Sequence, residues 1–285
     1  MHADGGDRGG LESVGATSLG IAFARARESR RTDRLFDDPY AERFVEAGAR
    51  MGSPLAEAMT GGGPGATAGI WDFLNHHVAI RTRFFDDDLA AATASGIRQV
   101  VLVAVGLDTR ALRLPWPAGV RVFELDQAPV LEFKERVLGA QATSDHRVVV
   151  PVDLRHDWRQ ALAAAGFDAA ERSAWLVEGL FPALTAEQSD VLVGRVSAMA
   201  APGSRLAYDD TGDAESMRPL IAVLDPILVE LWKGGPAGDP VTWLDDLGWD
   251  GEVLDQLDVS LSYGRASDLE PANWPRPRLM RATRR

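Results

Sequence analysis

Residues 99–106 have the sequence Gln-Val-Val-Leu-Val-Ala-Val-Gly, and this stretch decides the fold class. A continuous run of β-branched and aliphatic residues that ends in glycine is typical of a strand buried on both faces of a parallel sheet. Strands and helices are predicted to alternate after it, which indicates βαβ units and an α/β fold with a parallel sheet. The further strands are predicted over residues 120–125, 147–152, 174–177 and 205–208, and the helices over 109–114, 128–138, 158–165 and 186–200.

The chain before this stretch has helical patterning. Helices are predicted over residues 18–31, 40–49 and 70–94, with a Gly/Pro/Ala-rich loop at 61–69. We therefore expect one structural domain in which a helical N-terminal extension over residues 15–95 precedes a core over 96–285. Residues 1–14 are rich in Gly and Asp, and we expect them to form a disordered tail.

Weaker signals follow the fifth strand. A helix is predicted over residues 217–232. Two strands, 253–261 and 278–282, are expected to pair as an antiparallel hairpin at the sheet edge.

Composition excludes several classes of protein. The 285 residues include no cysteine, which excludes disulfides, thiolate catalysis and Cys-ligated zinc. The net charge of −12 disfavours nucleic acid and anionic membranes as partners, because both are polyanions. No secretory signal opens the chain, and the longest apolar run, 100–105, is too short to span a bilayer. We expect a cytoplasmic protein with a small-molecule partner and no metal site; whether it forms a homodimer is left open.

The predicted strands end in small residues or carboxylates, namely Gly106, Asp126, Asp153 and Glu178. Ligands of open α/β sheets bind at these carboxyl ends. Glycine lets the backbone approach a ligand, and a carboxylate after the second strand can accept hydrogen bonds from ribose hydroxyls. The pattern predicts a nucleoside-containing ligand, although Asp126 and Glu178 could instead cap the helices that follow them.

Two nucleoside cofactors fit this pattern, a nicotinamide dinucleotide and S-adenosylmethionine. A dinucleotide site needs Gly-x-Gly-x-x-Gly, whereas residues 104–109 read Ala-Val-Gly-Leu-Asp-Thr and keep only Gly106. Asp108 would also repel a pyrophosphate. S-adenosylmethionine contains no phosphate, so the residues favour it.

Six short motifs, in this order, resemble the leucine carboxyl methyltransferase family. They are most similar to its actinobacterial branch of candidate S-adenosylmethionine-dependent O-methyltransferases. The resemblance spans about residues 18–210 and implies a Rossmann-like class I methyltransferase. Such a fold has a mostly parallel seven-stranded sheet, helices on both faces and a helical N-terminal lid over the cofactor. The motifs lie at residues 37–41, 81–86, 104–110, 123–126, 152–155 and 177–180.

The resemblance implies roles around the methionine part of S-adenosylmethionine. Arg27 and Arg81 match positions that bind the cofactor carboxylate, and Glu178 would face its ammonium group. Ala104 and Gly106 would lie beside the methionine chain.

The resemblance also implies roles around the adenosine. Asp126 would bind the ribose hydroxyls, with Glu124 nearby. Asp153 and Leu154 would frame the adenine.

The acceptor side departs from the family, which commonly has a tyrosine where this chain has Ala183. We expect Phe181, Ala183 and Tyr208 to face the substrate. The departure leaves open an alternative, a protein that binds S-adenosylmethionine without transferring its methyl group.

The main prediction is O-methylation of a small molecule, a carboxylate or an acidic hydroxyl of a secondary metabolite. A carboxylate is ionised at neutral pH and needs no general base, whereas a hydroxyl would need one. The candidate bases are His76, His77 and Asp209.

Overall fold

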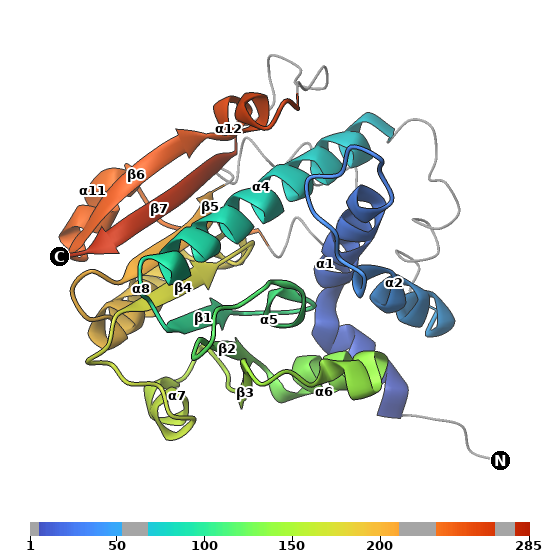
Figure 1. Cartoon of the computed structure of the whole chain (residues 1–285), viewed down its shortest axis with the longest axis horizontal. Helices are drawn as coiled ribbons and strands as arrows, with labels where there is room; N and C mark the ends of the chain where they lie inside the picture. The colour runs from blue at the N-terminus through green and yellow to red at the C-terminus, as the bar shows by residue number, and fades with distance from the viewer. Residues whose placement is uncertain (1–5, 53–67, 211–231, 266–276) are drawn as a thin grey trace.

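The computed structural model describes residues 6–52, 68–210, 232–265 and 277–285 (Figure 1). A seven-stranded sheet with the order β3-β2-β1-β4-β5-β7-β6 runs through it. The first five strands are parallel, β7 is antiparallel to β5, and β6 is antiparallel to β7 at the edge. The strands are β1 (Gln99–Val103), β2 (Arg121–Asp126), β3 (Arg147–Pro151), β4 (Ser173–Val177), β5 (Arg205–Asp210), β6 (Trp249–Asp255) and β7 (Arg278–Arg284). The predicted α/β fold is confirmed.

Helices cover both faces of the sheet. One face carries α4 (Ala68–Ala94), α5 (Arg110–Arg113), α6 (Ala128–Leu138) and α12 (Gln256–Ser262), with a short 3-10 helix, η2 (Gly139–Ala142), after α6. The other face carries η3 (Phe181–Ala183), α7 (Arg159–Ala164), α8 (Ala186–Met199) and α11 (Pro240–Asp246). None of the described helices is long and apolar enough to cross a membrane.

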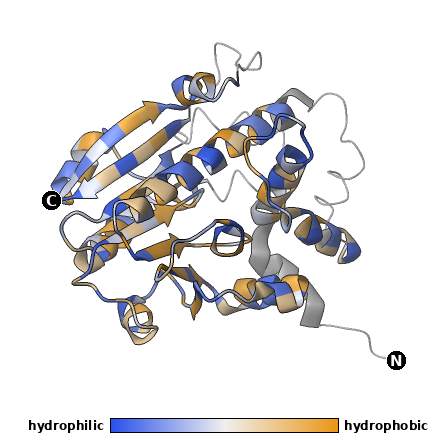
Figure 2. Cartoon of the chain, viewed as in Figure 1, coloured by the Kyte–Doolittle hydropathy of each residue, from blue (hydrophilic) through white to orange (hydrophobic). Residues whose placement is uncertain are grey.

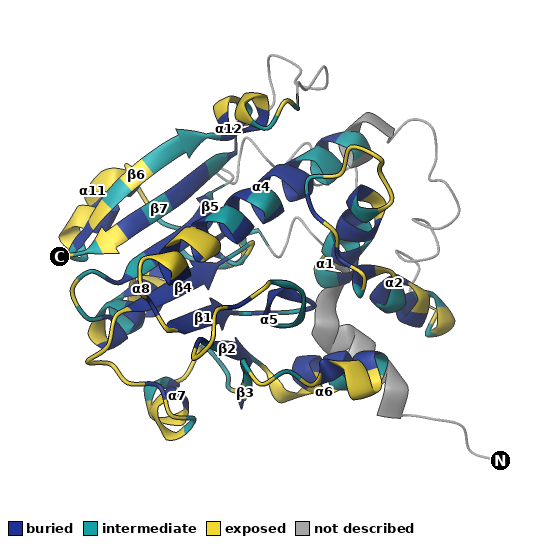
Figure 3. Ribbon diagram, viewed as in Figure 1, coloured by how far each residue is buried: buried dark blue, intermediate teal, exposed yellow. Residues whose placement is uncertain are grey.

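The central strands explain why two cores form. Successive side chains of a strand point to opposite faces. In β1, Val100 and Leu102 therefore pack with α4, while Val101 and Val103 pack beneath α7 and α8. Strands β1 and β4 are buried along their whole length (Figure 3). The apolar colouring of the central strands in Figure 2 follows the same pattern.

The N-terminal helices α1 (Gly6–Ser29) and α2 (Ala41–Arg50) pack against α6 through a third core that includes Leu19, Phe44 and Phe133. Helix α1 begins at Gly6, inside the segment predicted to be a disordered tail; residues 1–5 lie outside the described residues. Extending an existing helix costs far less than nucleating one, so the docked part of α1 supports its first turns despite their glycines.

The C-terminal hairpin confirms the predicted antiparallel edge but corrects the bounds of its first strand. The predicted strand over residues 253–261 is in fact β6 followed by α12. Asp255 ends the strand, because its side chain accepts a hydrogen bond from the Leu257 amide and caps α12. Of the predicted helix over 217–232, residues 217–231 lie outside the described residues, as do 61–67 of the predicted loop; Ala68 and Gly69 belong to α4.

Candidate functional site

The turn after β1 is built for close approach. Ala104 and Gly106 have positive φ angles of 52° and 51°. A Cβ atom on Gly106 would lie 3.2 Å from Ser18 Oγ of α1. A non-glycine residue in the left-handed region is strained, and such strain gathers at functional sites.

Asp126, at the end of β2, is tied to this turn. Its Oδ2 accepts a 2.7 Å hydrogen bond from the Gly106 amide, and its Oδ1 accepts one of 2.7 Å from the Gln127 amide. Burial raises the pKa of Asp126, against the opposing effect of these two hydrogen bonds. Gln127, and not Asp126, is the N-cap of α6, so the capping alternative does not describe this carboxylate.

Arg81 of α4 meets Glu178 and Asp209 where β4 and β5 end. Its Nη1 donates to Asp209 Oδ2 over 2.7 Å, and its Nε lies 3.0 Å from Glu178 Oε1. Arg81 is thus a buried guanidinium paired with two carboxylates from neighbouring strand ends. Asp209 Oδ1 also accepts from the Gly179 amide over 2.6 Å, which fixes the turn that carries Glu178.

Arg110 extends this cluster, and sequence reasoning missed it. The side chain is fully buried and donates to Asp86 Oδ1 over 2.7 Å and to Glu178 Oε2 over 2.6 Å. It also pairs with Asp108. The resulting buried ion-pair network contains three guanidinium and four carboxylate groups, a net charge of −1: Arg81, Arg110, Arg113, Asp86, Asp108, Glu178 and Asp209.

Asp108 is not a free negative charge facing the ligand, as the sequence suggests, because its carboxylate is paired with Arg110. Burial opposes its ionisation, but Arg110 and other nearby cations hold its pKa far below the usual value. A carboxylate paired in this way repels a pyrophosphate less than an unpaired carboxylate would. The missing glycines of residues 104–109 still argue against a dinucleotide.

Glu124 does not join the predicted site. It is fully buried, with Lys134 Nζ 2.9 Å from Oε1 and Arg147 Nη2 2.7 Å from Oε2. Glu124 and Asp126 lie two residues apart in β2, so the neutralised Glu124 lies beneath α6 while Asp126 reaches the end of the strand.

The turn after β3 adjoins Asp126, since the Val152 amide donates to the Asp126 carbonyl over 2.8 Å. Asp153 is partly exposed, and hydrogen bonds from Arg155 lower its pKa to about 2. Leu154 packs against the core. The turn that carries both residues thus adjoins the end of β2, and their adenine role stays a prediction.

Arg27 is not brought to the network. Its side chain is 53% exposed and pairs with Asp72 over 3.0 Å. Arg25 is the buried arginine of α1; its Nη2 donates to the Leu107 carbonyl over 2.6 Å and its Nε lies 3.2 Å from Asp38 Oδ2. Positions two apart on a helix point about 200° apart, which explains why only one of the two faces the β1 turn.

The three residues predicted to face the acceptor do not line one common surface. Phe181 and Tyr208 are buried, with ring centroids 4.9 Å apart, whereas Ala183 is exposed in η3. Tyr208 and Asp209 point to opposite faces of β5, Tyr208 toward the α8 side and Asp209 toward α4. Burial raises the pKa of Tyr208, and within the described structure its hydroxyl has no hydrogen-bond partner.

The two histidines of α4 contact α12. His76 Nε2 lies 3.0 Å from Ser260 Oγ, and His77 Nδ1 lies 2.5 Å from Gln256 Oε1. Of the three candidate bases, Asp209 alone is ion-paired within the network by a direct hydrogen bond to Arg81.

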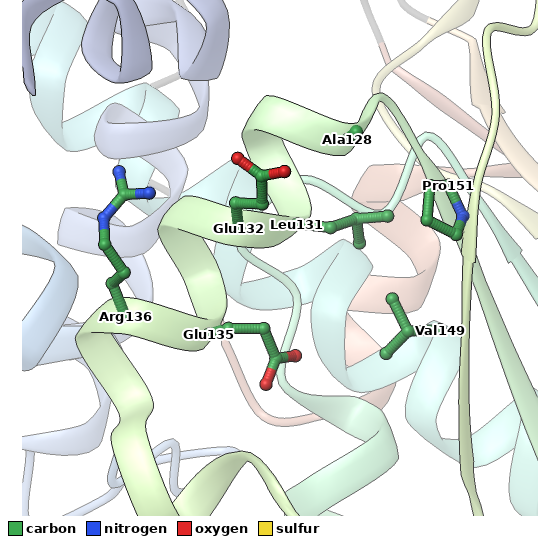
Figure 4. A pocket seen from close by; sticks show the side chains of 7 residues that line it. All are labelled: Ala128, Leu131, Glu132, Glu135, Arg136, Val149 and Pro151. Carbon is green, nitrogen blue, oxygen red and sulfur yellow. The ribbon is translucent and has the colours of Figure 1, made fainter. Parts of the chain in front are cut away.

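A groove of about 380 Å³ lies between α6 and the edge strand β3 (Figure 4). Leu131, Val149 and Pro151 point toward one another across it, while Arg136 extends away along the outer side of α6. None of the predicted site residues lines this groove, although it begins two positions beyond Asp126.

Several known proteins are similar to this chain in sequence. A relative from Parafrankia is 46% identical over 270 residues, covering 93% of this chain and 86% of its own. One from Mycobacteroides abscessus is 40% identical over 291 residues and covers 95% of each chain. Both are named as candidate S-adenosyl-L-methionine-dependent methyltransferases.

Two solved structures share the fold. A DUF574 family protein from Streptomyces avermitilis aligns with a TM-score of 0.61 at 14% identity, covering 96% of this chain and 98% of its own. A candidate methyltransferase from Thermobifida fusca aligns with a TM-score of 0.54 at 19% identity, over 78% and 90%. The predicted Rossmann-like methyltransferase fold is confirmed. The sequence profile of the leucine carboxyl methyltransferase family matches residues 18–197, and the chain belongs to this family.

Proposed function

We propose that the chain transfers the methyl group of S-adenosylmethionine to an oxygen atom of a small-molecule acceptor, most favourably a carboxylate of a secondary metabolite. Its family and its relatives make it an S-adenosylmethionine-dependent methyltransferase. The acceptor and the residue roles are our proposal.

Arg81 carries this proposal. Its guanidinium is buried and ion-paired with Glu178 and Asp209 where β4 and β5 end, and a guanidinium at this position suits a ligand that brings a carboxylate. Glu178 can accept from an ammonium group of the same ligand. S-adenosylmethionine carries a sulfonium, an ammonium and a carboxylate, a net charge of about +1 that complements the −1 of the network.

The adenosine side fits as well. Asp126 can accept from ribose hydroxyls, and the turn at Gly106 allows the backbone to come close. A buried carboxylate with a raised pKa is more typical of a binding site than of a stabilising contact.

Bound S-adenosylmethionine would supply a methyl group already activated by its sulfonium. The chain's own residues would then bind, align and exclude water, because alignment dominates such a displacement. None of the three candidate bases is suited to act as a general base. Burial lowers the pKa of His76, and its Nε2 lies 3.0 Å from Ser260 Oγ on α12. The pKa of His77 is lowered to about 4 by burial and by Arg81, and Asp209 is paired with Arg81. A carboxylate acceptor needs no base, so this arrangement favours it over a hydroxyl.

Calorimetry with three ligands tests the cofactor. We expect S-adenosylmethionine and its demethylated product, S-adenosylhomocysteine, to bind, and NAD not to bind. At 100 times the dissociation constant, either adenosyl ligand should add about 2.7 kcal/mol to the free energy of unfolding. Binding of NAD, or of neither adenosyl ligand, would contradict the assignment.

A labelled-methyl assay tests the acceptor class. With S-adenosylmethionine labelled on its methyl group and a set of small carboxylates and phenols, we expect label in products that mild base hydrolyses to methanol. Such lability distinguishes methyl esters from methyl ethers. Label confined to base-stable products would exclude the carboxylate. A chain that binds the cofactor and labels no acceptor in a broad extract would support binding without transfer.

The N-terminal lid gives a separate prediction. Arg25 joins α1 to the Leu107 carbonyl, next to Gly106, so Arg25→Met should weaken S-adenosylhomocysteine binding about 10- to 100-fold. Arg27→Met is the matched control and should change the affinity less than about twofold, because surface ion pairs contribute little. Hydrogen exchange of residues 18–34 should slow when the ligand binds. Equal losses in both variants would contradict the anchoring role of Arg25.

A further inference from the structure

His77 lies on α4 one turn before Arg81 and is held from both sides. Its Nδ1 is 2.5 Å from Gln256 Oε1, and its Nε2 is 3.4 Å from Arg81 Nη1. A guanidinium can only donate, and the amide oxygen of Gln256 can only accept. The ring therefore carries its proton on Nδ1 and presents a bare Nε2 to Arg81.

The surroundings of His77 keep the ring neutral. Arg81 and His76 face it from α4, Asp209 Oδ2 lies 3.8 Å from Nε2 on β5, and Gln256 faces it from α12. Phe73 stacks on the ring with centroids 6.4 Å apart. Burial is the main cause of its lowered pKa, and the charge of Arg81 adds to it. A protonated ring would donate from both nitrogens and could not accept from Arg81.

Gln256 lies outside the parallel part of the sheet, whose strand ends carry Glu178 and Asp209. It is 2% exposed and is the first residue of α12, beyond the antiparallel edge of the sheet. Helix α12 packs against α4, and Gln256 is separated from His77 by 179 positions in the sequence. No predicted site residue lies on β6 or α12.

We propose that Gln256 and His77 are positioning residues for Arg81. Gln256 fixes the tautomer of His77, and the bare Nε2 of His77 accepts from Arg81, so that the guanidinium keeps its orientation toward Glu178 and Asp209, the position at which it would meet a ligand carboxylate. This role rests on the proposed function, in which Arg81 binds the carboxylate of S-adenosylmethionine. It makes the C-terminal hairpin a contributor to cofactor affinity.

Two substitutions at Gln256 test this role in the full-length chain. Gln256→Met removes the acceptor and should weaken S-adenosylhomocysteine binding about 3- to 10-fold at every pH. Gln256→Glu introduces a carboxylate beside Nδ1, which raises the pKa of His77. In that variant the affinity should fall as the pH is lowered from about 8 to about 6, because the ring gains a proton and stops accepting from Arg81. The wild type, with a His77 pKa of about 4, should stay constant over this range.

Asp258→Asn is the matched control, because Asp258 is exposed on the same helix. It should leave the affinity and its pH dependence unchanged. Thermal melts confirm that each variant is folded before it is titrated.

A second readout needs no cofactor. In ¹⁵N spectra of the free protein, the His77 signal, assigned with His77→Gln, should be that of a neutral ring protonated on Nδ1. A ring protonated on Nε2 would overturn the proposal. The proposal would also be overturned if the wild type binds S-adenosylhomocysteine and a folded Gln256→Met variant binds it with the same affinity. A wild type that binds neither adenosyl ligand would instead refute the proposed function, and this role with it.

Discussion

Replacing Arg110 with methionine is expected to lower the free energy of unfolding by about 3–5 kcal/mol, because it removes the central cation of a buried network. Arg110 is fully buried, and its donors reach Asp86, Asp108 and Glu178. Burial alone would lower the pKa of Arg110, but these carboxylates raise it well above its usual value. Without the guanidinium they would be left partly unpaired in a region of low dielectric constant.

Urea unfolding measures this loss, and Arg159→Met is the matched control. Arg159 also makes two hydrogen bonds to one aspartate, Asp157, but the pair lies at the surface. Exposed pairs contribute about 0–1 kcal/mol, so the control should remain close to wild type. Similar small losses in both variants would mean that water solvates the network, and the argument from burial would fail.

The strands could be predicted from the sequence because burial on both faces leaves a continuous apolar run. Residues 100–103 and 174–177 are such runs, and they make up most of β1 and β4. Strand β6 could not be placed correctly, because it contains Gly251 and acidic residues that disfavour strands. Tertiary packing explains why a glycine lies inside this strand. A Cβ atom on Gly251 would lie 2.6 Å from Leu244 Cδ1, so the glycine makes room for α11.

Part of the candidate site could also be predicted, because carboxyl ends of neighbouring parallel strands meet. That topology brings Gly106 to Asp126, and it brings Glu178 to Asp209 through the Gly179 amide. Arg110 and Gln256 were missed because partners that define their roles, Asp86 and His77, lie 24 and 179 positions away, and the sequence shows no such pairing.

The sequence gives little signal for Arg25. It lies in line with the buried Leu19 and Ala22 at a helical spacing of three, but Ala24 and Ala26 of α1 are buried as well, so no separate apolar stripe distinguishes Arg25 from Arg27.

The carboxylate of Asp126 should have the largest effect on cofactor affinity. Asp126→Ala removes the acceptor proposed for the ribose hydroxyls and also the bond that holds the Gly106 amide. At about 1.5–3 kcal/mol for each hydrogen bond to a charged group, the affinity for S-adenosylhomocysteine should fall about 10- to 1,000-fold. Asp126→Asn, which keeps one oxygen acceptor and loses the charge, should fall between alanine and wild type.

Stability should change much less than affinity in the same variants, and this difference separates a binding role from a structural one. The folded state raises the pKa of Asp126, which means that folding disfavours its ionised form. A group with a raised pKa opposes folding once the pH exceeds its unfolded value, so at neutral pH its removal relieves this cost while losing two backbone hydrogen bonds. Glu132→Ala, an exposed carboxylate on the adjoining α6, should change neither affinity nor stability. If Asp126→Ala lowers the melting temperature strongly and leaves the calorimetric affinity unchanged, Asp126 is a support for the Gly106 turn and does not bind the ribose.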